Sequence, residues 1–123
     1  PRRCVLMHMP PLLGHVDGVG NVAEIYNQGN GKRLTIAPPA DLFRFLPYKG
    51  SIGVNGASLT IANVDSEKKH CIIALIPHTI KHTTLGKLKV GDMVNIEVDA
   101  IARYLDNLLE ERFSTFEKQV FQR

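Results

Sequence analysis

The chain has 123 residues, a length that favours one core over two, because a separate core rarely forms below about 50 residues. Hydrophobic residues make up 44% and charged residues 22%, which excludes wholesale disorder, and the apolar runs fall far short of the roughly 20 residues that cross a bilayer. A net charge of +3 tolerates nucleic acid without requiring it, and the two cysteines, Cys4 and Cys71, lack the spacing of a metal or redox site. With no secretory signal or membrane span in view, we expect a soluble, cytoplasmic protein.

The first part of the chain predicts two strands behind an irregular arm. Residues 1–13 have no clean period and contain a double proline, so we interpret them as the arm. His15–Tyr26 alternates loosely and predicts a strand, and the turn signal Asn27–Gly31 separates it from a return strand over Arg33–Ala37. A second double proline then ends the strand, and Ala40–Leu46 predicts one or two helical turns.

The second part predicts four more strands. The Asn55-Gly56 pair favours a tight hairpin turn, because both of its central residues need a positive φ angle. The predicted strands are Ser51–Val54, Ala57–Val64, His70–Ile76 and Met93–Val98. Between the last two, Pro77–Leu88 is polar and threonine-rich, and predicts a loop with a helical turn. Short strands with hairpin turns and few crossover helices favour an all-β fold, an antiparallel barrel, over a parallel α/β sheet.

After Asp99 the apolar residues recur at three- and four-residue steps, which predicts a helix over residues 100–123. Its apolar positions are Ile101, Leu105, Leu108, Leu109, Phe113, Phe116 and Val120. The stripe packs either on its own barrel or on copies from other subunits. The phenylalanines near the end of this helix would remain partly exposed to solvent in a monomer. We therefore predict a homotrimer held by this helix, which Phe116→Asp would dissociate.

Three groups of polar side chains are candidates for chemistry. His15 lies in a glycine-flanked segment where a ligand can approach the backbone, and an imidazole titrates near neutral pH. Ser58 and Thr60 share one face of a strand, and inward hydroxyls there either close a local network or bind a polar ligand. His78 and His82 have the spacing of two metal ligands on a helix, but no further ligand follows, so we expect no metal site. The residues alone therefore predict a small β-barrel with a polar pocket.

Several segments taken together resemble the second lumazine-binding repeat of the riboflavin synthase family. They keep the family's order and spacing over about residues 14–110, namely Gly14–Gly20, Tyr48–Thr60, Leu75–Thr79, His82–Gly86, Lys89–Asp92 and Asn95–Asp99. Ser58 identifies the repeat, because the first repeat of the family carries a reactive cysteine at this position and the second carries serine.

The resemblance implies a fold, an activity and a set of site residues. The fold is a six-stranded Greek-key barrel over residues 14–99, followed by a helix through which three subunits assemble. The activity converts two molecules of 6,7-dimethyl-8-ribityllumazine into riboflavin and 5-amino-6-ribitylaminouracil by moving a four-carbon unit, with no cofactor or metal, and lumazine synthase is an implied partner. His15 and Ser58 match catalytic positions. The substrate-binding positions match Gly14, His15, Val16, Lys49, Asn55, Ser58, Leu59, Thr60, Ala74, Leu75, Ile76, Pro77, His78, Thr79 and Asp99.

The chain departs from the family pattern in three ways. The first repeat is absent, a Gly-Gly-His approach to the Gly-His motif is replaced by Met9–Leu13, and Asn55 stands where an acidic residue is usual. A lone second barrel would hold one of two lumazines, so we expect the chain to be a fragment, a truncated gene product or one chain of a split enzyme.

Two other functions compete with the enzyme. A non-catalytic lumazine or flavin carrier, similar to the antenna proteins of luminous bacteria, would bind the ligand without consuming it. A nucleic-acid-binding barrel is disfavoured, because such barrels use interleaved surface aromatics, whereas this chain has only three tyrosines and five phenylalanines, most of them in apolar settings.

Overall fold

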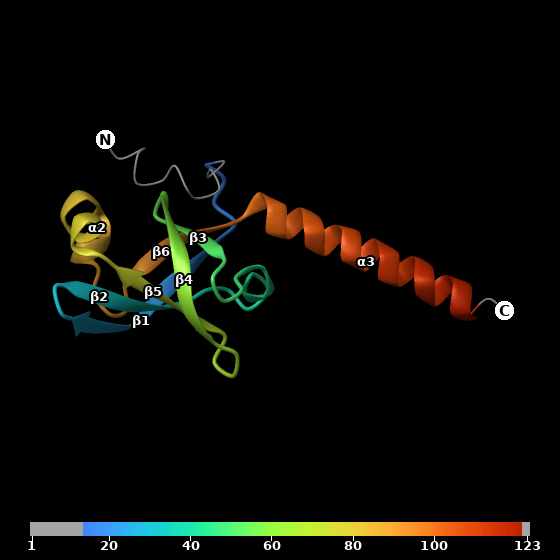
Figure 1. Cartoon of the computed structure of the whole chain (residues 1–123), viewed down its shortest axis with the longest axis horizontal. Coiled ribbons are helices and arrows are strands. Elements are labelled where there is room, and N and C mark those ends of the chain that lie inside the picture. The colour runs from blue at the N-terminus through green and yellow to red at the C-terminus, as the bar shows by residue number, and fades with distance from the viewer. Residues whose placement is uncertain (1–13, 122–123) are drawn as a thin grey trace.

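A computed structural model describes residues 14–121, with side chains to residue 112, as a closed barrel followed by a long helix (Figure 1). The strands are β1 (Gly18–Gln28), β2 (Gly31–Ala37), β3 (Ser51–Val54), β4 (Ala57–Asp65), β5 (His70–Leu75) and β6 (Met93–Val98). The helices are η1 (Phe43–Phe45), α2 (Pro77–His82), η2 (Thr84–Lys87) and α3 (Ala100–Phe121). The barrel order is β1-β2-β5-β4-β3-β6, and its neighbouring strands are antiparallel. The predicted all-β class, six-stranded barrel and C-terminal helix are confirmed.

The β3–β4 hairpin turns on the residue pair that predicted it. Asn55 and Gly56 have φ angles of 50° and 84°, as a two-residue turn matching the strand twist requires. The backbone N–H of Asn55 donates to the carbonyl of Asn95 at 3.0 Å, and Oδ1 of Asn55 accepts from the backbone N–H of Asn95 at 2.8 Å. The turn is therefore fastened to β6 as well as joining β3 to β4.

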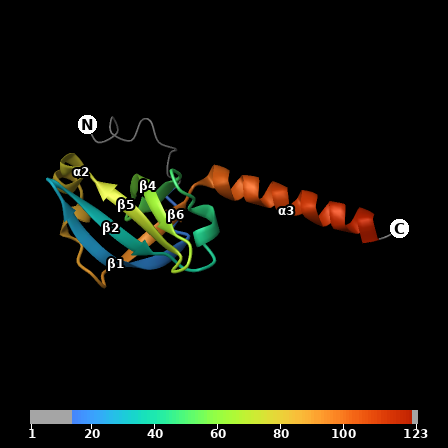
Figure 2. The ribbon, with the colours of Figure 1, turned by 60° about the horizontal axis from the view of Figure 1, so that its bottom comes forward.

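The barrel interior is filled by alternate aliphatic side chains of the strands. Leu34 and Ile36 on β2, Ile61 on β4 and Ile73 on β5 are completely buried. Two short elements lie at opposite ends of the barrel, α2 with η2 at one end and the teal turn η1 at the other (Figures 1 and 2). Each end is covered by a buried apolar side chain, Leu85 of η2 or Phe45 of η1. The strands are thereby held in fixed positions, and their outer faces are available for a site.

The structure corrects the start of the first strand, which was predicted at His15 and begins at Gly18. The reason lies in Asp17, whose Oδ2 accepts the backbone N–H of Val98 at 2.8 Å. A side chain thus takes a bond that a continued ladder would give to a backbone carbonyl. Residues 14–16 therefore precede the barrel instead of belonging to it.

The structure also corrects the end of the fifth strand. Ile76 was predicted as its last residue but is the N-cap of α2, with Pro77 in the first turn. Proline suits that position because its φ angle is already helical and its missing N–H would have no partner there. The predicted loop with a helical turn over Pro77–Leu88 is resolved into α2 and η2.

Helix α3 contacts the barrel through its polar face. Arg44 of η1 forms ion pairs of 3.0 Å with both Asp106 and Glu110 of α3. The apolar positions on the other face are exposed, namely Ile101, Tyr104, Leu105, Leu108 and Leu109. The stripe therefore does not pack on its own barrel over these residues, whereas the side chains of Phe113, Phe116 and Val120 lie outside the described residues. In the part of the chain that the structure describes, no helix has the length and apolar character to cross a membrane.

Candidate functional site

The strand register brings the central predicted residues onto the outer face of β3 and β4. Ser58 lies opposite Gly53 of β3, and Thr60 lies opposite Ser51. Gly53 is in turn opposite Glu97 of β6. Because directly opposed residues of an antiparallel pair point to the same side, these positions form two neighbouring rows across three strands. We call this surface the β3–β4 face, defined by Ser51, Gly53, Ser58, Thr60 and Glu97.

The predicted direction of the two hydroxyls was wrong. Ser58 and Thr60 share a face, as predicted, but Leu59 and Ile61 occupy the interior and are buried, so the hydroxyls point outward. Thr60 is exposed, whereas Ser58 is only 4% exposed. Its Oγ is buried without a hydrogen-bond partner among residues 14–121. A polar ligand on this face would supply the bond that the described residues do not.

Further predicted site residues lie on β5, on α2 and in the segment before β3. Ala74 is exposed at the end of β5, and Ile76 is 55% exposed between β5 and α2. His78 is exposed and Thr79 is half-buried on α2. Lys49 is fastened beside β4, because its backbone N–H donates to the carbonyl of Ile61 at 2.9 Å. These predicted residues thus supply both apolar and polar side chains.

Four predicted site residues have structural tasks. Leu59 and Leu75 are buried in the core, so only their backbone can meet a ligand. Oδ1 of Asn55 is already bonded to β6. Asp99 begins α3, where its Oδ1 accepts the backbone N–H of Ile101 at 3.0 Å, as an N-cap does. Their assignment to the site therefore depends on backbone contacts or on atoms that these bonds leave free.

The segment with Gly14, His15 and Val16 lies beside the barrel's β1–β6 edge. All three residues are exposed, and Gly14 has a φ angle of 77°, which glycine adopts without strain. Asp17, whose role the sequence reasoning missed, holds this segment through Val98 and through an ion pair of 3.1 Å with Arg103 of α3. The sequence signal that could have revealed this role is the carboxylate of Asp17, directly after the Gly-His-Val motif.

His78 and His82 of α2 form a pair of neighbouring rings. The ring centroids of His78 and His82 lie 4.3 Å apart, with the planes inclined by 39°. Within the described residues, no three His, Cys, Asp or Glu side chains are grouped as metal ligands. Both histidines are exposed, and His78 directly precedes Thr79 in the chain.

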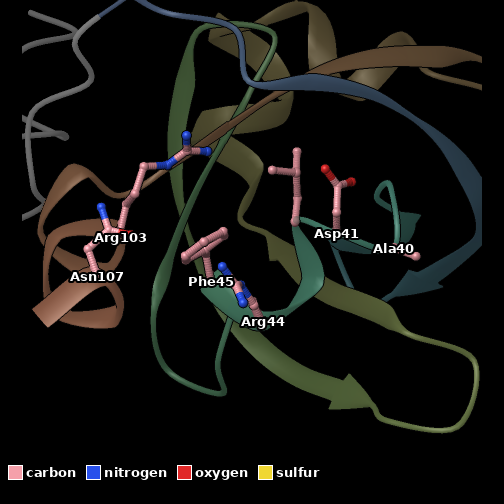
Figure 3. Close-up of a pocket in the computed structure, with 7 residues that line it drawn as sticks. Ala40, Asp41, Arg44, Phe45, Arg103 and Asn107 are labelled. Carbon is pink, nitrogen blue, oxygen red and sulfur yellow. The ribbon is translucent and has the colours of Figure 1, made fainter. Parts of the chain in front are cut away.

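A groove of about 480 Å³ lies away from the predicted residues, between η1 and the first turns of α3 (Figure 3). It is lined by Ala40, Asp41, Leu42, Arg44, Phe45, Arg103 and Asn107. Both arginines of the groove form ion pairs, Arg44 with Asp106 and Glu110, and Arg103 with Asp17. The groove is therefore chiefly the place where α3 is attached to the barrel.

Comparison with known proteins matches the chain to one family. A family model described as the lumazine binding domain matches residues 13–99. The riboflavin synthase of Actinobacillus pleuropneumoniae is 41% identical over 96 residues, which are 78% of this chain and 44% of that protein. The riboflavin synthase of Schizosaccharomyces pombe is 35% identical over 107 residues, which are 86% and 50% of the two chains. The chain thus spans about half the length of these curated relatives.

Solved structures give the same result for the fold. LumP complexed with riboflavin aligns with a TM-score of 0.65 at 30% identity, covering 71% of this chain and 46% of LumP. LumP complexed with 6,7-dimethyl-8-(1'-D-ribityl) lumazine aligns with a TM-score of 0.66 at 29% identity, covering 72% and 49%. The resemblance drawn from the sequence motifs is confirmed.

Proposed function

The chain belongs to the lumazine-binding domain family, and we propose that it is the second barrel of a riboflavin synthase. In this proposal the whole enzyme converts two molecules of 6,7-dimethyl-8-ribityllumazine into riboflavin and 5-amino-6-ribitylaminouracil. This chain contributes the site for one of the two lumazines, and a second barrel contributes the other. The similarity to riboflavin synthases from bacteria and a yeast supports this activity.

The observation that carries the proposal is the unpartnered hydroxyl of Ser58. A buried polar group without a hydrogen bond costs about 1–3 kcal/mol, so such groups in a stable barrel call for a partner that binds there. Thr60 adds an exposed hydroxyl on the same face, and Ile76 adds an exposed apolar side chain at its edge. Hydroxyls beside an apolar surface suit a flat heterocycle that carries a polyhydroxylated chain.

The proposed roles follow from the chemistry of the reaction. Deprotonation of the C7 methyl group of one lumazine gives a carbanion that attacks the second lumazine, and His15 accepts and returns the proton. Ser58 assists as the second catalytic residue, and the backbone of Leu75–Pro77 pairs with the polar edge of the heterocycle. Lys49 and Thr79 bind from the rim of the site. Holding two lumazines together supplies the proximity on which the transfer depends.

A non-catalytic lumazine or flavin carrier is the second candidate. The structural likeness to LumP favours it, because those structures are described as complexes with riboflavin and with the lumazine. A single barrel with one binding face would serve a carrier without any partner barrel.

Several finer properties belong to the same proposal. Residues 14–99 are the ligand-binding unit and residues 100–123 the oligomerisation helix of a homotrimer, with lumazine synthase as a further partner. The strand order β6-β3-β4-β5 supports the Greek-key description. The free, buried thiol of Cys71 supports a cytoplasmic location, where thiols stay reduced.

The test is to follow lumazine consumption and riboflavin formation by the chain alone and by a protein that carries both barrels. We expect turnover from the two-barrel protein, and we expect His15→Ala to lower it by roughly 10²–10⁴-fold while lumazine still binds. His70→Ala is the matched control, because His70 begins β5 opposite Asp65, at a position not assigned to the site. Unchanged turnover in His15→Ala would make His15 a structural residue, and binding without turnover by the two-barrel protein would establish the carrier function.

A further inference from the structure

Asp17 is held at both oxygens of its carboxylate. Oδ2 accepts the backbone N–H of Val98 at 2.8 Å, and Oδ1 lies 3.1 Å from Nη2 of Arg103. Its side chain is only 19% exposed, so the pair is partly shielded from solvent. Asp17 follows His15 by two residues, and its backbone N–H donates to the carbonyl of Ile96 at 2.8 Å. The segment that carries His15 is therefore tied to β6 and to α3 immediately after the histidine.

Arg103 belongs to a second set of contacts that hold α3 against η1. Its Cζ lies 5.2 Å from the centre of the Phe45 ring, within the range of a cation–π interaction (Figure 3). Arg44 lies 4.8 Å from the same ring and forms ion pairs with Asp106 and Glu110. Two arginines thus attach α3 to the barrel around one phenylalanine, but only Arg103 also contacts Asp17.

We propose that Arg103 is a positioning residue, which acts through Asp17 to fix the His15 segment relative to the β3–β4 face. This inference rests on the proposed function, because it requires that His15 contact the bound ligand. It makes ligand affinity depend on the contact between Arg103 and Asp17, and not on the ion pairs of Arg44 that hold the same helix.

The two arginines allow a matched comparison in the whole chain. Arg103→Gln removes the contact with Asp17, whereas Arg44→Gln weakens the attachment of α3 without touching the His15 segment. Riboflavin and 6,7-dimethyl-8-ribityllumazine are titrated against each variant, with thermal unfolding measured in parallel. We expect Arg103→Gln to weaken affinity by about five-fold, the lower end of typical couplings, while Arg44→Gln leaves it unchanged. Arg103→Lys should restore part of the loss.

A double-mutant cycle separates positioning from general damage. Asp17→Asn keeps an oxygen acceptor for the N–H of Val98 but loses the ion pair, so it should weaken affinity as Arg103→Gln does. The combined variant should lose no more than either single variant. Additive losses, or equal losses in Arg44→Gln and Arg103→Gln, would overturn the proposal.

The imidazole NMR signals of His15 provide a readout that does not need a ligand. Arg103→Gln should shift or broaden them relative to the wild type, while the signals of His70 stay unchanged. If the wild type binds neither compound, the proposed function fails and these signals alone decide the positioning role. Unchanged His15 signals in Arg103→Gln would overturn that role whatever the titrations give.

Discussion

Ser58 combines two properties that rarely occur together in one serine. It is 4% exposed, and its hydroxyl has no hydrogen-bond partner among the described residues. Its neighbour across the ladder is Gly53, which has no side chain to offer as a partner. A residue that costs stability in the free protein and lies on the proposed binding face is expected where function, not folding, selects the side chain.

Ser58→Ala should therefore have opposite effects on stability and on binding. Removing an unpartnered buried hydroxyl should leave the unfolding free energy unchanged or raise it by up to about 1 kcal/mol. Adding Thr60→Val should bring the total loss of riboflavin or lumazine affinity to about 1–3 kcal/mol. Denaturant unfolding and fluorescence titration measure the two quantities.

Thr35→Val is the control for the hydroxyl variants. Thr35 is also a buried hydroxyl residue of a strand, but it lies on β2 opposite Glu24 and Ile72, away from the β3–β4 face. Its substitution should leave ligand affinity unchanged. An unaltered affinity in the Ser58 and Thr60 double variant would show that the ligand does not use this face.

Cys71 gives the barrel a stability that depends on pH. Burial raises the pKa of its thiol from 9.0 to about 11, because the thiolate is disfavoured in the apolar interior. Since the folded pKa is the higher one, the contribution is complete below pH 9 and is lost as the pH rises through 11. Relative to Cys71→Ala, the wild type should lose about 1.4 kcal/mol of unfolding free energy between pH 8 and pH 10. A pH-independent difference between the two proteins would contradict this burial of the thiol.

At the scale of the elements, α3 is unusual because its polar face contacts the barrel and its apolar face is exposed to solvent. The polar face, with Arg103, Asp106 and Glu110, contacts the barrel and its neighbouring segment. The opposite face exposes Ile101, Tyr104, Leu105, Leu108 and Leu109 to solvent. An amphipathic helix normally buries its apolar stripe, so this face is suited to packing against copies of itself.

We expect the chain to self-associate through this stripe. Leu105→Asp places a carboxylate in the stripe and should dissociate the assembly to monomers. Asn107→Asp adds the same group outside the stripe and should leave the assembly intact. Sedimentation velocity at tens of micromolar distinguishes these outcomes, and a monomeric wild type at that concentration would remove the basis for the oligomer.

The elements differ in how far local sequence determines them. The β3–β4 hairpin follows from Asn55-Gly56, because its turn chemistry is local. The start of β1 does not, because Asp17 ends the ladder through Val98, which is distant in sequence. The outward direction of Ser58 and Thr60 was not predicted either. The two-residue period of a strand shows that they share a face, but not which face. The strongly apolar Leu59 and Ile61 between and after them were the available signal for the interior.

At the scale of the whole molecule, the proposed ligand lies on one face of a closed barrel, and the chain spans about half the length of its curated relatives. Motifs in family order were enough to predict the barrel and its family, because they record the positions of turns and strands. They did not predict how α3 is attached, because that depends on contacts of Arg44 and Arg103 with residues far along the chain. The contact between α3 and the segment after His15 is therefore visible only in the structure.

The most direct test of the central claim is to map riboflavin binding on the chain by amide NMR. The β3–β4 face and the start of α2 should respond, with the largest shift changes at Ser58, Thr60 and Ile76–Thr79. The groove between η1 and α3, lined by Phe45 and Asn107 among others, should show none comparable. Saturable shifts centred on Ser58 are the predicted result, whereas shifts centred on that groove, or no saturable shifts at all, would contradict the assignment of the ligand to this face.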